Sequence, residues 1–477
     1  MIGTTQSQEA LFIPGSLRSF LPDDHILVQV NAILDLSWLR GEVGDLYDVH
    51  GGRPSIPPEN AIRLMLAGFF LGLVKDRALL REAQVNLAIR WFARYPLDQA
   101  LPDHSTLSKL RTRWGAEMFK HVFQRVVQQC IAAGLVSGET VHMDATLIRA
   151  DVSWASVVEQ HAEQVLQENP APADSLPSAA AAPRKKRSLT DPDASLSTAK
   201  KTQPMEPCYK QHTAVDDRAG IIVDVAVETG EASEGAQLLA QIGRVAEATG
   251  VLPAVITADS GYAHPTNYAA LECLAIDAVI PPQRQGRRFP ERLPIRRFAY
   301  DAVHQRVRCP AGQSLHLVSE HDGALTFRST SAVCRACPLR ARCFAPSATV
   351  RTLHIPAGYE AWLRARRRKA RGWDAATRRH YRRHRWLVEG IHGEAKTCHG
   401  LRRAVRRGLS QVAIQVYLTA AVINLKRLAK HTACLGGILA RGWYLRGREM
   451  LWTAITRGTV ALTMLSLYRD PGARLAA

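Results

Sequence analysis

The run Thr140-Val-His-Met-Asp144 is a short, β-prone segment that leads into a carboxylate. The run Ala254-Val-Ile-Thr-Ala-Asp259 has the same character and ends in a second aspartate. Short apolar runs of this kind predict buried strands. Because the ends of neighbouring strands bring distant parts of a sequence together, we expect Asp144 and Asp259 to lie close to each other.

The segments around these two runs alternate between strand and helix patterns. A polar turn at 216–220 separates two apolar strands and predicts a hairpin. In chain order the expected elements are strands 140–144, 212–215 and 221–227, helix 234–249, strand 254–259, helix 266–274 and strand 278–280. This order predicts an α/β fold, a mixed sheet with helices on its faces.

A long helix expected over 375–398 carries a third carboxylate of interest. Four of its polar residues follow at i, i+4, i+7 and i+11 and so share one face: Arg385, Glu389, His392 and Lys396. A carboxylate placed between cations can hold a metal while the cations hold phosphates. Taken alone, such a stripe is more often a solvated salt bridge, and a strand-end aspartate is more often a turn former. The metal interpretation is favoured because all three carboxylates occur together with an uneven charge distribution.

The positive charge of the chain is concentrated in one region. The 477 residues carry a net charge of +19, and 351–450 alone holds 23 Lys and Arg against 5 Asp and Glu. A solubilising surface has no reason to concentrate its charge, whereas a surface that follows DNA phosphates does. We therefore expect a nucleic-acid partner, with DNA contacts from Arg385, Lys396, Arg402, Arg403, Arg406 and Arg407.

Residues 1–135 are predicted to form a separate all-α domain. The expected helices are 59–74, 77–93 and 103–114. Asp103 or Ser105 can cap the third of these, whose exposed face is expected to carry Ser108, Lys109, Arg111 and Arg113. Short helices that end in a basic helix fit a helix-turn-helix DNA-binding domain, but a plain helical bundle explains the pattern equally well.

Two segments interrupt the α/β pattern. Residues 167–206 lose periodicity and become rich in Ala, Pro and Ser, with a basic run at 184–187, which predicts a flexible linker or insertion. Residues 285–350 form a Cys-rich insertion, in which Cys334 and Cys337 make a Cys-x2-Cys pair and Cys309 and Cys343 flank it. Four cysteines can bind a structural zinc ion, with free thiols as the equal alternative. The other five cysteines are interpreted as ordinary core or surface residues.

Taken together, these motifs resemble the insertion-sequence transposases of the DDE superfamily. Met143–Thr146 resembles the strand of the first Asp, Thr257–Tyr262 that of the second, and Arg385-x3-Glu389-x6-Lys396 matches the third motif. Further similar segments are Gly52–Pro57, Pro102–Leu107, Tyr209–Asp216 and Asn424–Arg427. The chain departs from the family at Ala145, which replaces a usual glycine. It also places Tyr381 four residues before Arg385, where the family has three.

The resemblance implies an RNase H-like core over 136–284 and 351–432, followed by a helical tail over 433–477. It implies two Mg²⁺ or Mn²⁺ ions held by Asp144, Asp259 and Glu389, with Asp144 bridging both. It also implies cleavage of double-stranded DNA at terminal inverted repeats, strand transfer to target DNA, and a homodimer assembled on DNA. A nuclease with the same cluster and an inactive DNA-binding regulator remain the alternatives, and Glu394 is the nearest substitute for Glu389.

The chain is expected to be cytoplasmic and nucleoid-associated. No basic residue precedes Arg18, so no signal peptide is expected, and nine scattered cysteines do not resemble a disulfide framework. The uncharged stretch 409–425 approaches the length of a membrane span. It contains five polar residues, and we therefore expect a buried helix over about 410–428 rather than a span.

Overall fold

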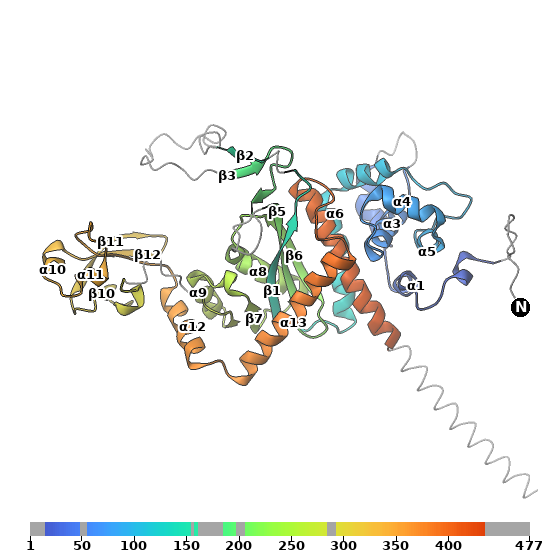
Figure 1. Ribbon diagram of the computed structural model, residues 1–477. Coiled ribbons are helices and arrows are strands. Elements are labelled where there is room, and N and C mark those ends of the chain that lie inside the picture. The colour runs from blue at the N-terminus through green and yellow to red at the C-terminus, as the bar shows by residue number, and fades with distance from the viewer. Residues whose placement is uncertain are drawn as a thin grey trace, which may run out of the picture.

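The computed structural model describes residues 15–47, 55–153, 157–160, 185–196, 206–283 and 292–434. In Figure 1 a helical region lies on one side of a central sheet, and a small second sheet lies on the other side. The tail expected over 433–477 falls outside the described residues except for its first two positions.

The N-terminal region is helical, as predicted. Its α-helices are α1 Ile26–Asn31, α2 Leu39–Val43, α3 Pro58–Phe70, α4 Asp76–Val85, α5 Leu87–Phe92 and α6 His104–Ala132. The Asp103 carboxylate caps α6 by accepting a hydrogen bond from the Ser105 amide at 2.8 Å. Gly115, with φ 70°, interrupts α6, so the predicted helix end at Trp114 is a true boundary.

One prediction for α6 is wrong. Arg111 was expected on the exposed face, but it is 2% exposed and pairs with Asp76 of α4. The reason is helical spacing, because Arg111 shares a face with the buried Leu107 and Trp114. Ser108, Lys109 and Arg113 are exposed as expected.

The central sheet is mixed, as predicted. Its five main strands are β1 Thr140–Arg149, β5 Pro207–Asp216, β6 Ile222–Thr229, β7 Val255–Ala258 and β8 Asp277–Val279. They lie in the order β6-β5-β1-β7-β8, with β5 antiparallel to β6 and β1, and β7 parallel to β1 and β8. Three antiparallel strands followed by two parallel ones make the sheet expected of an RNase H-like core.

The first strand is longer than predicted. It does not end at Asp144 but continues to Arg149, paired with β5 alone. Its parallel pairing with β7 stops at Met143, which lies opposite Ala258. Asp144 therefore stands where β7 leaves the sheet, so one side of the strand is open next to the carboxylate.

Helices cover the sheet and bring the third motif to it. The 3-10 helix η4 Glu234–Gln237 leads into α8 Leu238–Thr249, which packs on β6, while α9 Pro265–Cys273 packs on β8. The long helix α13 has the predicted bounds, Ala375–Cys398, and crosses β1, β7 and β8 (Figure 1). Its N-cap is Asp374, whose carboxylate accepts a hydrogen bond from the Thr377 amide at 2.7 Å.

The last described helix, Leu409–Cys434, belongs to the core. By length and composition it could cross a membrane, but 83% of its most apolar 18-residue window is buried inside the protein. The Asn424 side chain joins it to β6 through hydrogen bonds to the Ile222 amide and carbonyl at 2.9 and 2.8 Å. A fully buried aliphatic side chain contributes about 1.5–3 kcal/mol, and Val412, Ile423 and Leu425 are all fully buried.

The predicted linker over 167–206 is ordered in part. Residues 185–196 contain β3 Lys185–Ser188 and β4 Ser195–Leu196; β3 pairs with β2 Val157–Gln160, and β4 joins β5. Asp191, 1% exposed, accepts a hydrogen bond from the Tyr209 hydroxyl at 2.6 Å. Of the basic run 184–187, residues 185–187 fall in β3 with side chains that are not described, and Arg184 lies outside the described residues. Composition hid this structure because the ordering contacts come from β5, far away in the sequence.

The Cys-rich insertion forms the second sheet. Each strand of this sheet pairs with the next one along the chain. The strands are β9 Ala299–Asp301, β10 Arg306–Arg308, β11 Ser314–His321, β12 Ala324–Arg328 and β13 Thr352–Ile355. Two short helices, α10 Ser331–Arg335 and α11 Arg340–Cys343, connect β12 to β13. The insertion therefore extends to Ile355 rather than ending at 350. The helix α12, Tyr359–Arg371, then leads back to the core by packing on α9.

Candidate active site

Asp144 and Asp259 lie side by side at the point where β1 and β7 separate. Since Met143 pairs with Ala258 in a parallel register, each aspartate is the next residue of its strand. The Asp144 carboxylate accepts a hydrogen bond from the Ala145 amide at 2.8 Å. The Asp259 carboxylate accepts one from the Gly261 amide at 2.7 Å and caps the 3-10 helix η5 Ser260–Tyr262. Both carboxylates are thereby fixed by their own backbone.

The surroundings of Asp144 disfavour its negative charge. Burial raises the pKa of this carboxyl, and the Asp259 carboxylate raises it further. The Ala145 amide acts in the opposite direction, while Glu234 and Glu389 add to the increase, so that the pKa is about 7. A carboxylate crowded by other carboxylates is stabilised when a cation binds among them.

Glu389 approaches this pair from α13, but its side chain is 68% exposed. Its carboxylate lies 3.8 Å from Arg385, one helical turn away. Among the described residues, no three His, Cys, Asp or Glu side chains are close enough together to hold a metal ion. The carboxylate oxygens are of the type that Mg²⁺ or Mn²⁺ prefers, and the crowding around Asp144 fits a bound cation.

His392 and Lys396 follow Glu389 on α13 and face the sheet. His392 is 7% exposed, with Nδ1 3.6 Å from an Asp144 oxygen. Burial lowers the pKa of His392 to about 3, so the imidazole is neutral. Burial also lowers the pKa of Lys396, Arg402 adds to this effect, and Asp144 opposes it. Both residues therefore border the carboxylate group, as their spacing on the helix requires.

Tyr381 also reaches the carboxylates, despite its shifted position in the motif. Burial raises the pKa of its hydroxyl, and Asp259, Asp144 and Glu389 raise it further while Arg385 opposes them. Residues three and four positions away lie on the same side of a helix, so the shift relative to Arg385 does not turn the tyrosine away.

Glu234 is a nearby carboxylate that the sequence analysis did not identify. It stands at the start of η4 and raises the pKa of Asp144. A Cβ on Gly261 would come within 1.8 Å of a Glu234 oxygen, so a larger residue here would displace the end of that side chain. Glu234 opens a predicted helix in the sequence, and nothing in its local pattern distinguishes it from an ordinary helix-opening glutamate.

Glu394, the sequence-based substitute for Glu389, is engaged elsewhere. Burial alone would raise its pKa, but hydrogen bonds to His399 and Lys426 outweigh that and hold the pKa at about 2. Its carboxylate lies 2.5 Å from the Lys426 ammonium and 3.6 Å from Arg427 on the neighbouring helix. Glu394 joins two helices and is not part of the carboxylate group.

The four arginines of the 402–407 segment have different environments. The segment is attached to the end of β1, since Arg149 exchanges backbone hydrogen bonds with Arg402 and Ala404. Arg402, Arg403 and Arg407 are exposed, and two of them contact Asp151: Arg403 pairs with its carboxylate at 3.0 Å, and Arg407 donates to its backbone carbonyl at 3.1 Å. Arg406 is different, because its side chain is 17% exposed and pairs with Asp76 of α4 at 2.9 Å. Arg406 therefore joins the helical region to the core and does not offer a free cation to a ligand.

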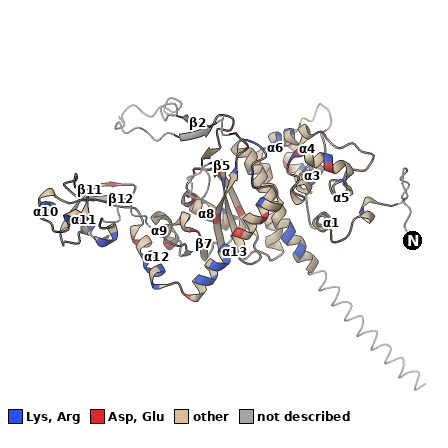
Figure 2. Cartoon of the chain, viewed as in Figure 1, with Lys and Arg blue, Asp and Glu red and all other residues tan. Residues whose placement is uncertain are grey.

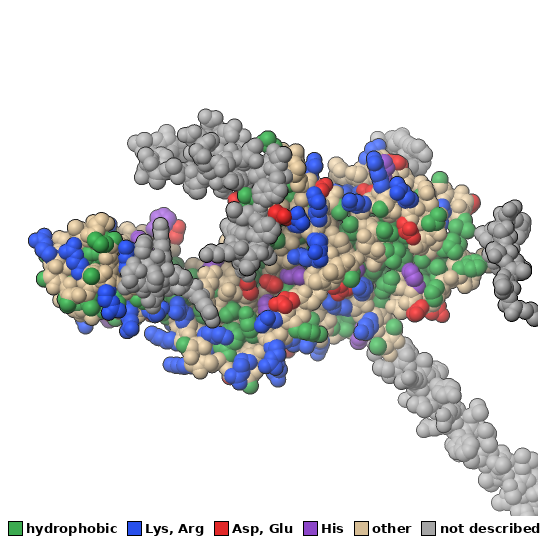
Figure 3. Space-filling view, in the orientation of Figure 1, with side chains coloured by type: hydrophobic (Ala, Val, Ile, Leu, Met, Phe, Trp, Pro, Cys, Tyr) green, Lys and Arg blue, Asp and Glu red, His purple; other side chains and the backbone are tan. Residues whose placement is uncertain are grey.

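Exposed cations gather beside the carboxylates. Figure 2 shows Lys and Arg positions along α12 and the first half of α13, and Figure 3 shows the side chains of such residues gathered on the same face. A shallow pocket of about 410 Å³ lies here, lined by Lys369, Trp373, Arg378, Tyr381, Arg382, Arg385, Trp386 and Glu389. Trp386 is 69% exposed in this cationic surface. An exposed aromatic ring among cations is typical of nucleic-acid interfaces, and the sequence analysis did not single it out.

The four cysteines of the insertion line one cavity of about 340 Å³. Burial raises the pKa of the Cys343 thiol, Arg351 opposes this, and Cys334, Cys337 and Cys309 raise it. All nine cysteines of the chain are free thiols in this structure. The four cysteines therefore lie around the same cavity. Among the described residues, however, no three of them are close enough together to hold a metal ion.

Two family models match the chain. Residues 15–113 match the family described as a transposase domain, DUF772, and residues 308–429 match the family described as a transposase DDE domain. The chain is a transposase of the DDE superfamily. The DDE match includes α13 and with it Glu389. Polynucleotidyl transfer that depends on a divalent metal is the general activity of such transposases.

Comparison with solved structures gives only distant likenesses to this transposase. The piggyBac transposase synaptic complex with hairpin DNA is 10% identical, with 87% of this chain and 74% of that chain covered and a TM-score of 0.35. Two Mos1 structures, a paired-end complex with the left transposon end and a pre-cleavage transpososome, are 11% and 12% identical. Each covers 50% of this chain and 64% or 65% of the other, with TM-scores of 0.16. TM-scores this low do not establish a shared overall fold, and no curated protein matches the chain.

Proposed function

We propose that Asp144, Asp259 and Glu389 are the catalytic carboxylates of this transposase and hold two Mg²⁺ or Mn²⁺ ions. The observation that carries the proposal is the place of Asp144, beside Asp259 at the separation of two parallel strands and within the electrostatic reach of Glu389. Asp144 is the most crowded of the three, and it would hold the ions together with Asp259 and Glu389.

The metal ions would activate the attacking oxygen and stabilise the leaving oxygen of an in-line displacement at phosphorus. The protein's own task is to hold the carboxylates and the DNA backbone in place. Asp144 and Asp259 are held by the Ala145 and Gly261 amides. Glu389 is the exposed member, and it would contribute its carboxylate after leaving its pair with Arg385.

The DNA strand would lie on the cationic surface beside this group. We assign the phosphate contacts to Arg385, Lys396, Arg402, Arg403 and Arg407, and we remove Arg406 from the set because it pairs with Asp76. The substrates would be double-stranded terminal inverted repeats and target DNA, bound by a homodimer assembled on the ends. The helical region would add sequence-specific contacts as a helix-turn-helix-like domain.

The test compares Glu389→Gln with the wild type in binding and cleavage of a duplex that carries the ends of the element. The substitution keeps the size of the side chain but removes its anionic oxygen, so cleavage with Mg²⁺ should fall by about 100-fold or more while DNA affinity is retained. Glu247→Gln, an exposed change on α8, is the matched control and should cleave normally. Cleavage at the wild-type rate by Glu389→Gln would contradict the assignment and direct attention to Glu234.

The same end-bearing duplex also distinguishes a transposase from the two alternatives, a nuclease and an inactive DNA-binding regulator. A transposase joins the freed 3′ ends to target DNA, whereas a nuclease with the same carboxylates only hydrolyses. Lys396→Ala should weaken end binding more than it slows a bound complex, since its assigned partner is a phosphate. A wild-type protein that binds ends but never cuts them would favour the inactive DNA-binding regulator.

A further inference from the structure

The face of the sheet that carries the carboxylates also carries two buried threonines, and α13 places a histidine against each. In a strand, alternate residues point to the same face, so His142 shares a face with Asp144, and Thr257 shares it with Asp259. The His384 Nδ1 lies 3.0 Å from the Thr257 hydroxyl. Eight residues later on α13, His392 Nε2 lies 3.0 Å from the hydroxyl of Thr213.

These two contacts hold the helix at both sides of the central strand. Thr257 belongs to β7 and Thr213 to β5, and β1 lies between those strands. Thr213 lies directly opposite Asp144 in the antiparallel register. Glu389 is located between the two histidines in the sequence of α13. The segment of about two helical turns that carries it is therefore attached to the sheet at both ends.

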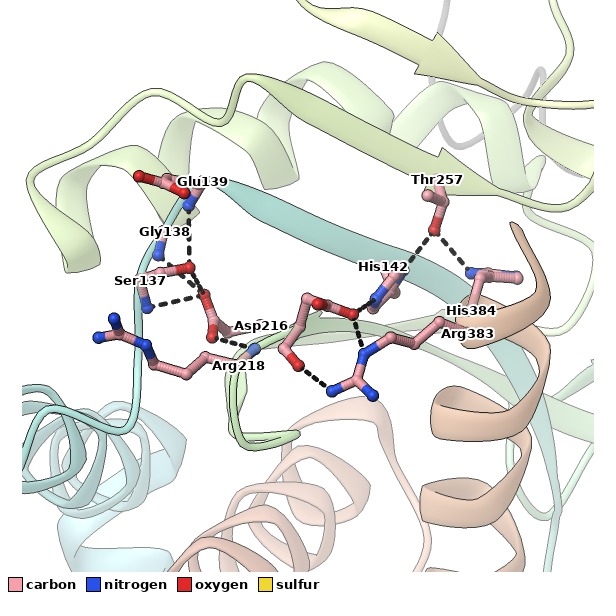
Figure 4. Close-up of polar contacts among 10 residues, drawn as sticks. Ser137, Gly138, Glu139, His142, Asp216, Arg218, Thr257, Arg383 and His384 are labelled. Atoms are coloured by element: carbon pink, nitrogen blue, oxygen red, sulfur yellow. Dashed lines mark hydrogen bonds and ion pairs between the residues drawn. The ribbon is translucent and has the colours of Figure 1, made fainter. Parts of the chain in front are cut away.

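The contact at Thr257 is part of a longer hydrogen-bonded chain, shown in Figure 4. His142 Nδ1 lies 2.6 Å from the Thr257 hydroxyl, and His142 Nε2 lies 2.8 Å from the Asp217 carboxylate. Arg383, the neighbour of His384, donates to the same carboxylate. The chain therefore begins and ends on α13 and passes through β1 and β7 on the way.

The chemistry of the groups fixes the direction of this chain. The Asp217 carboxylate accepts only, so His142 donates from Nε2 and, as a neutral ring, accepts at Nδ1. Thr257 then donates its hydroxyl proton to His142 and accepts from His384 Nδ1. Burial lowers the pKa of His384 to about 3 and also lowers that of His142, which agrees with neutral rings. The Thr257 hydroxyl is thus the one group that serves both histidines.

We propose that His384 and His392 are positioning residues, which fix α13 against Thr257 and Thr213 and so set the distance of Glu389 from Asp144 and Asp259. The proposal rests on the proposed function, since it gives these contacts a role in the reaction. The exposed Glu389 side chain has few contacts of its own to determine its place, so its position depends on the helix backbone. A displacement of about 1 Å at a catalytic group can cost about 100-fold in rate.

The test removes the threonine hydroxyls and leaves the proposed catalytic residues and both histidines intact. Thr257→Val and Thr213→Val keep the shape of the side chain but lose the hydroxyl, and Thr257→Ser keeps the hydroxyl. Thr419→Val is the matched control, because Thr419 is 2% exposed and donates only to Gln415 of its own helix at 2.8 Å. If Thr257→Val does not fold, Thr257→Ala removes the same hydroxyl without adding apolar surface.

Two readouts on the full-length chain decide the matter. Hydrogen exchange in metal-free protein should become faster in α13 for Thr257→Val and Thr213→Val, but not for Thr419→Val. Single-turnover cleavage of end DNA should fall about 10- to 100-fold with unchanged DNA affinity, and Thr257→Ser should restore it. Unchanged exchange in α13, or a cleavage loss no larger than that of Thr419→Val at equal thermal stability, would overturn the proposal. The exchange readout needs no catalysis, so a failure of the proposed function is seen separately in Glu389→Gln.

Discussion

The surroundings of Asp144 fit the role of metal ligand that we propose for it. Its carboxyl is held by the Ala145 amide, buried, and surrounded by Asp259, Glu234 and Glu389. Burial and the neighbouring charges bring its pKa to about 7, so in metal-free protein at neutral pH the group is about half protonated. A divalent cation must therefore displace a proton at this position.

Metal binding should for this reason depend on pH near neutrality. Because only the ionised carboxyl binds the cation, Mn²⁺ affinity should fall by up to about tenfold for each pH unit below 7 and level off above about pH 8. Titration calorimetry at pH 6, 7 and 8, in buffers of different ionisation enthalpy, measures both the affinity and the protons released. Asp144→Asn should bind Mn²⁺ weakly at every pH. A wild-type affinity that does not change between pH 6 and 8 would contradict the assigned role of Asp144.

The identity of single residues was predictable only where a motif contains them. Asp144, Asp259 and Glu389 stand in recognisable local sequences. The structure places Asp144 beside Asp259, whereas Glu389 pairs with Arg385, and its place in a shared metal site stays a prediction. Glu234 stands in no motif, because it reaches the group through space left by Gly261. Arg111 and Arg406 were assigned to exposed surfaces, but both pair with Asp76 in a contact between segments that are distant in the sequence.

At the scale of elements, α13 has two different faces. Its inner face carries the buried Val388, Ile391 and Ala395, together with the two histidines that bond to threonines. Its outer face carries Arg382 and the exposed Trp386, and the exposed Arg385 lies at the border of the two faces, one turn before Glu389. The same helix can therefore be fixed to the sheet on one side and present cations and an aromatic ring to DNA on the other.

The insertion between β8 and α12 is an element whose stability should depend on its cysteines. The sheet β9–β13 is small, and small units often need a metal or a disulfide in addition to an apolar core. Cys309, Cys334, Cys337 and Cys343 share one cavity, which motivates the zinc interpretation. Protein purified under reducing conditions should contain about one zinc per chain. Cys334→Ser with Cys337→Ser should lose the zinc and unfold at lower temperature.

Two controls make the zinc prediction decisive. Cys273→Ser and Cys398→Ser change exposed cysteines outside the insertion and should leave the metal content unchanged. Elemental analysis is the direct measurement, with thermal unfolding before and after chelation as the second. Zinc-free protein whose unfolding temperature does not respond to the cysteine changes would mean that the four residues are free thiols.

Elements were predictable where periodicity is local. The hairpin of β5 and β6 and the bounds of α13 follow from alternating or helical patterns, and both were located from sequence. The second half of β1 was missed because it pairs with β5 alone and its residues do not form an apolar run. The order in 185–196 was missed because the hydrogen bonds that create it come from Tyr209 and from the 408–409 backbone.

At the scale of the whole molecule, acidic and basic side chains occupy separate regions, which would separate metal binding from DNA binding. A small group of carboxylates lies at the sheet, and a larger cationic surface extends from it along α12 and α13 (Figure 3). Carboxylates attract cations and repel phosphates, so in the proposed function the DNA would be held beside the acidic group. The exposed arginines near the end of β1 are our proposed contacts for this, whereas Arg406 ties the helical region to the core.

The salt dependence of DNA binding should distinguish these arginines. Replacing Arg402, Arg403 and Arg407 by alanine should weaken binding to unrelated duplexes and reduce the slope of log affinity against log salt by about 2 to 3, because each lost phosphate contact removes about 0.9. Arg406→Ala should leave that slope nearly unchanged, because its guanidinium is already paired with Asp76. It should instead lower the free energy of unfolding by about 1–2 kcal/mol, since Asp76 keeps only Arg111 as a partner. Fluorescence anisotropy at several salt concentrations and thermal unfolding of the same proteins measure the two effects. If Arg406→Ala flattens the slope as much as a change at Arg402, the ion pair with Asp76 opens when DNA binds, and Arg406 belongs to the DNA surface.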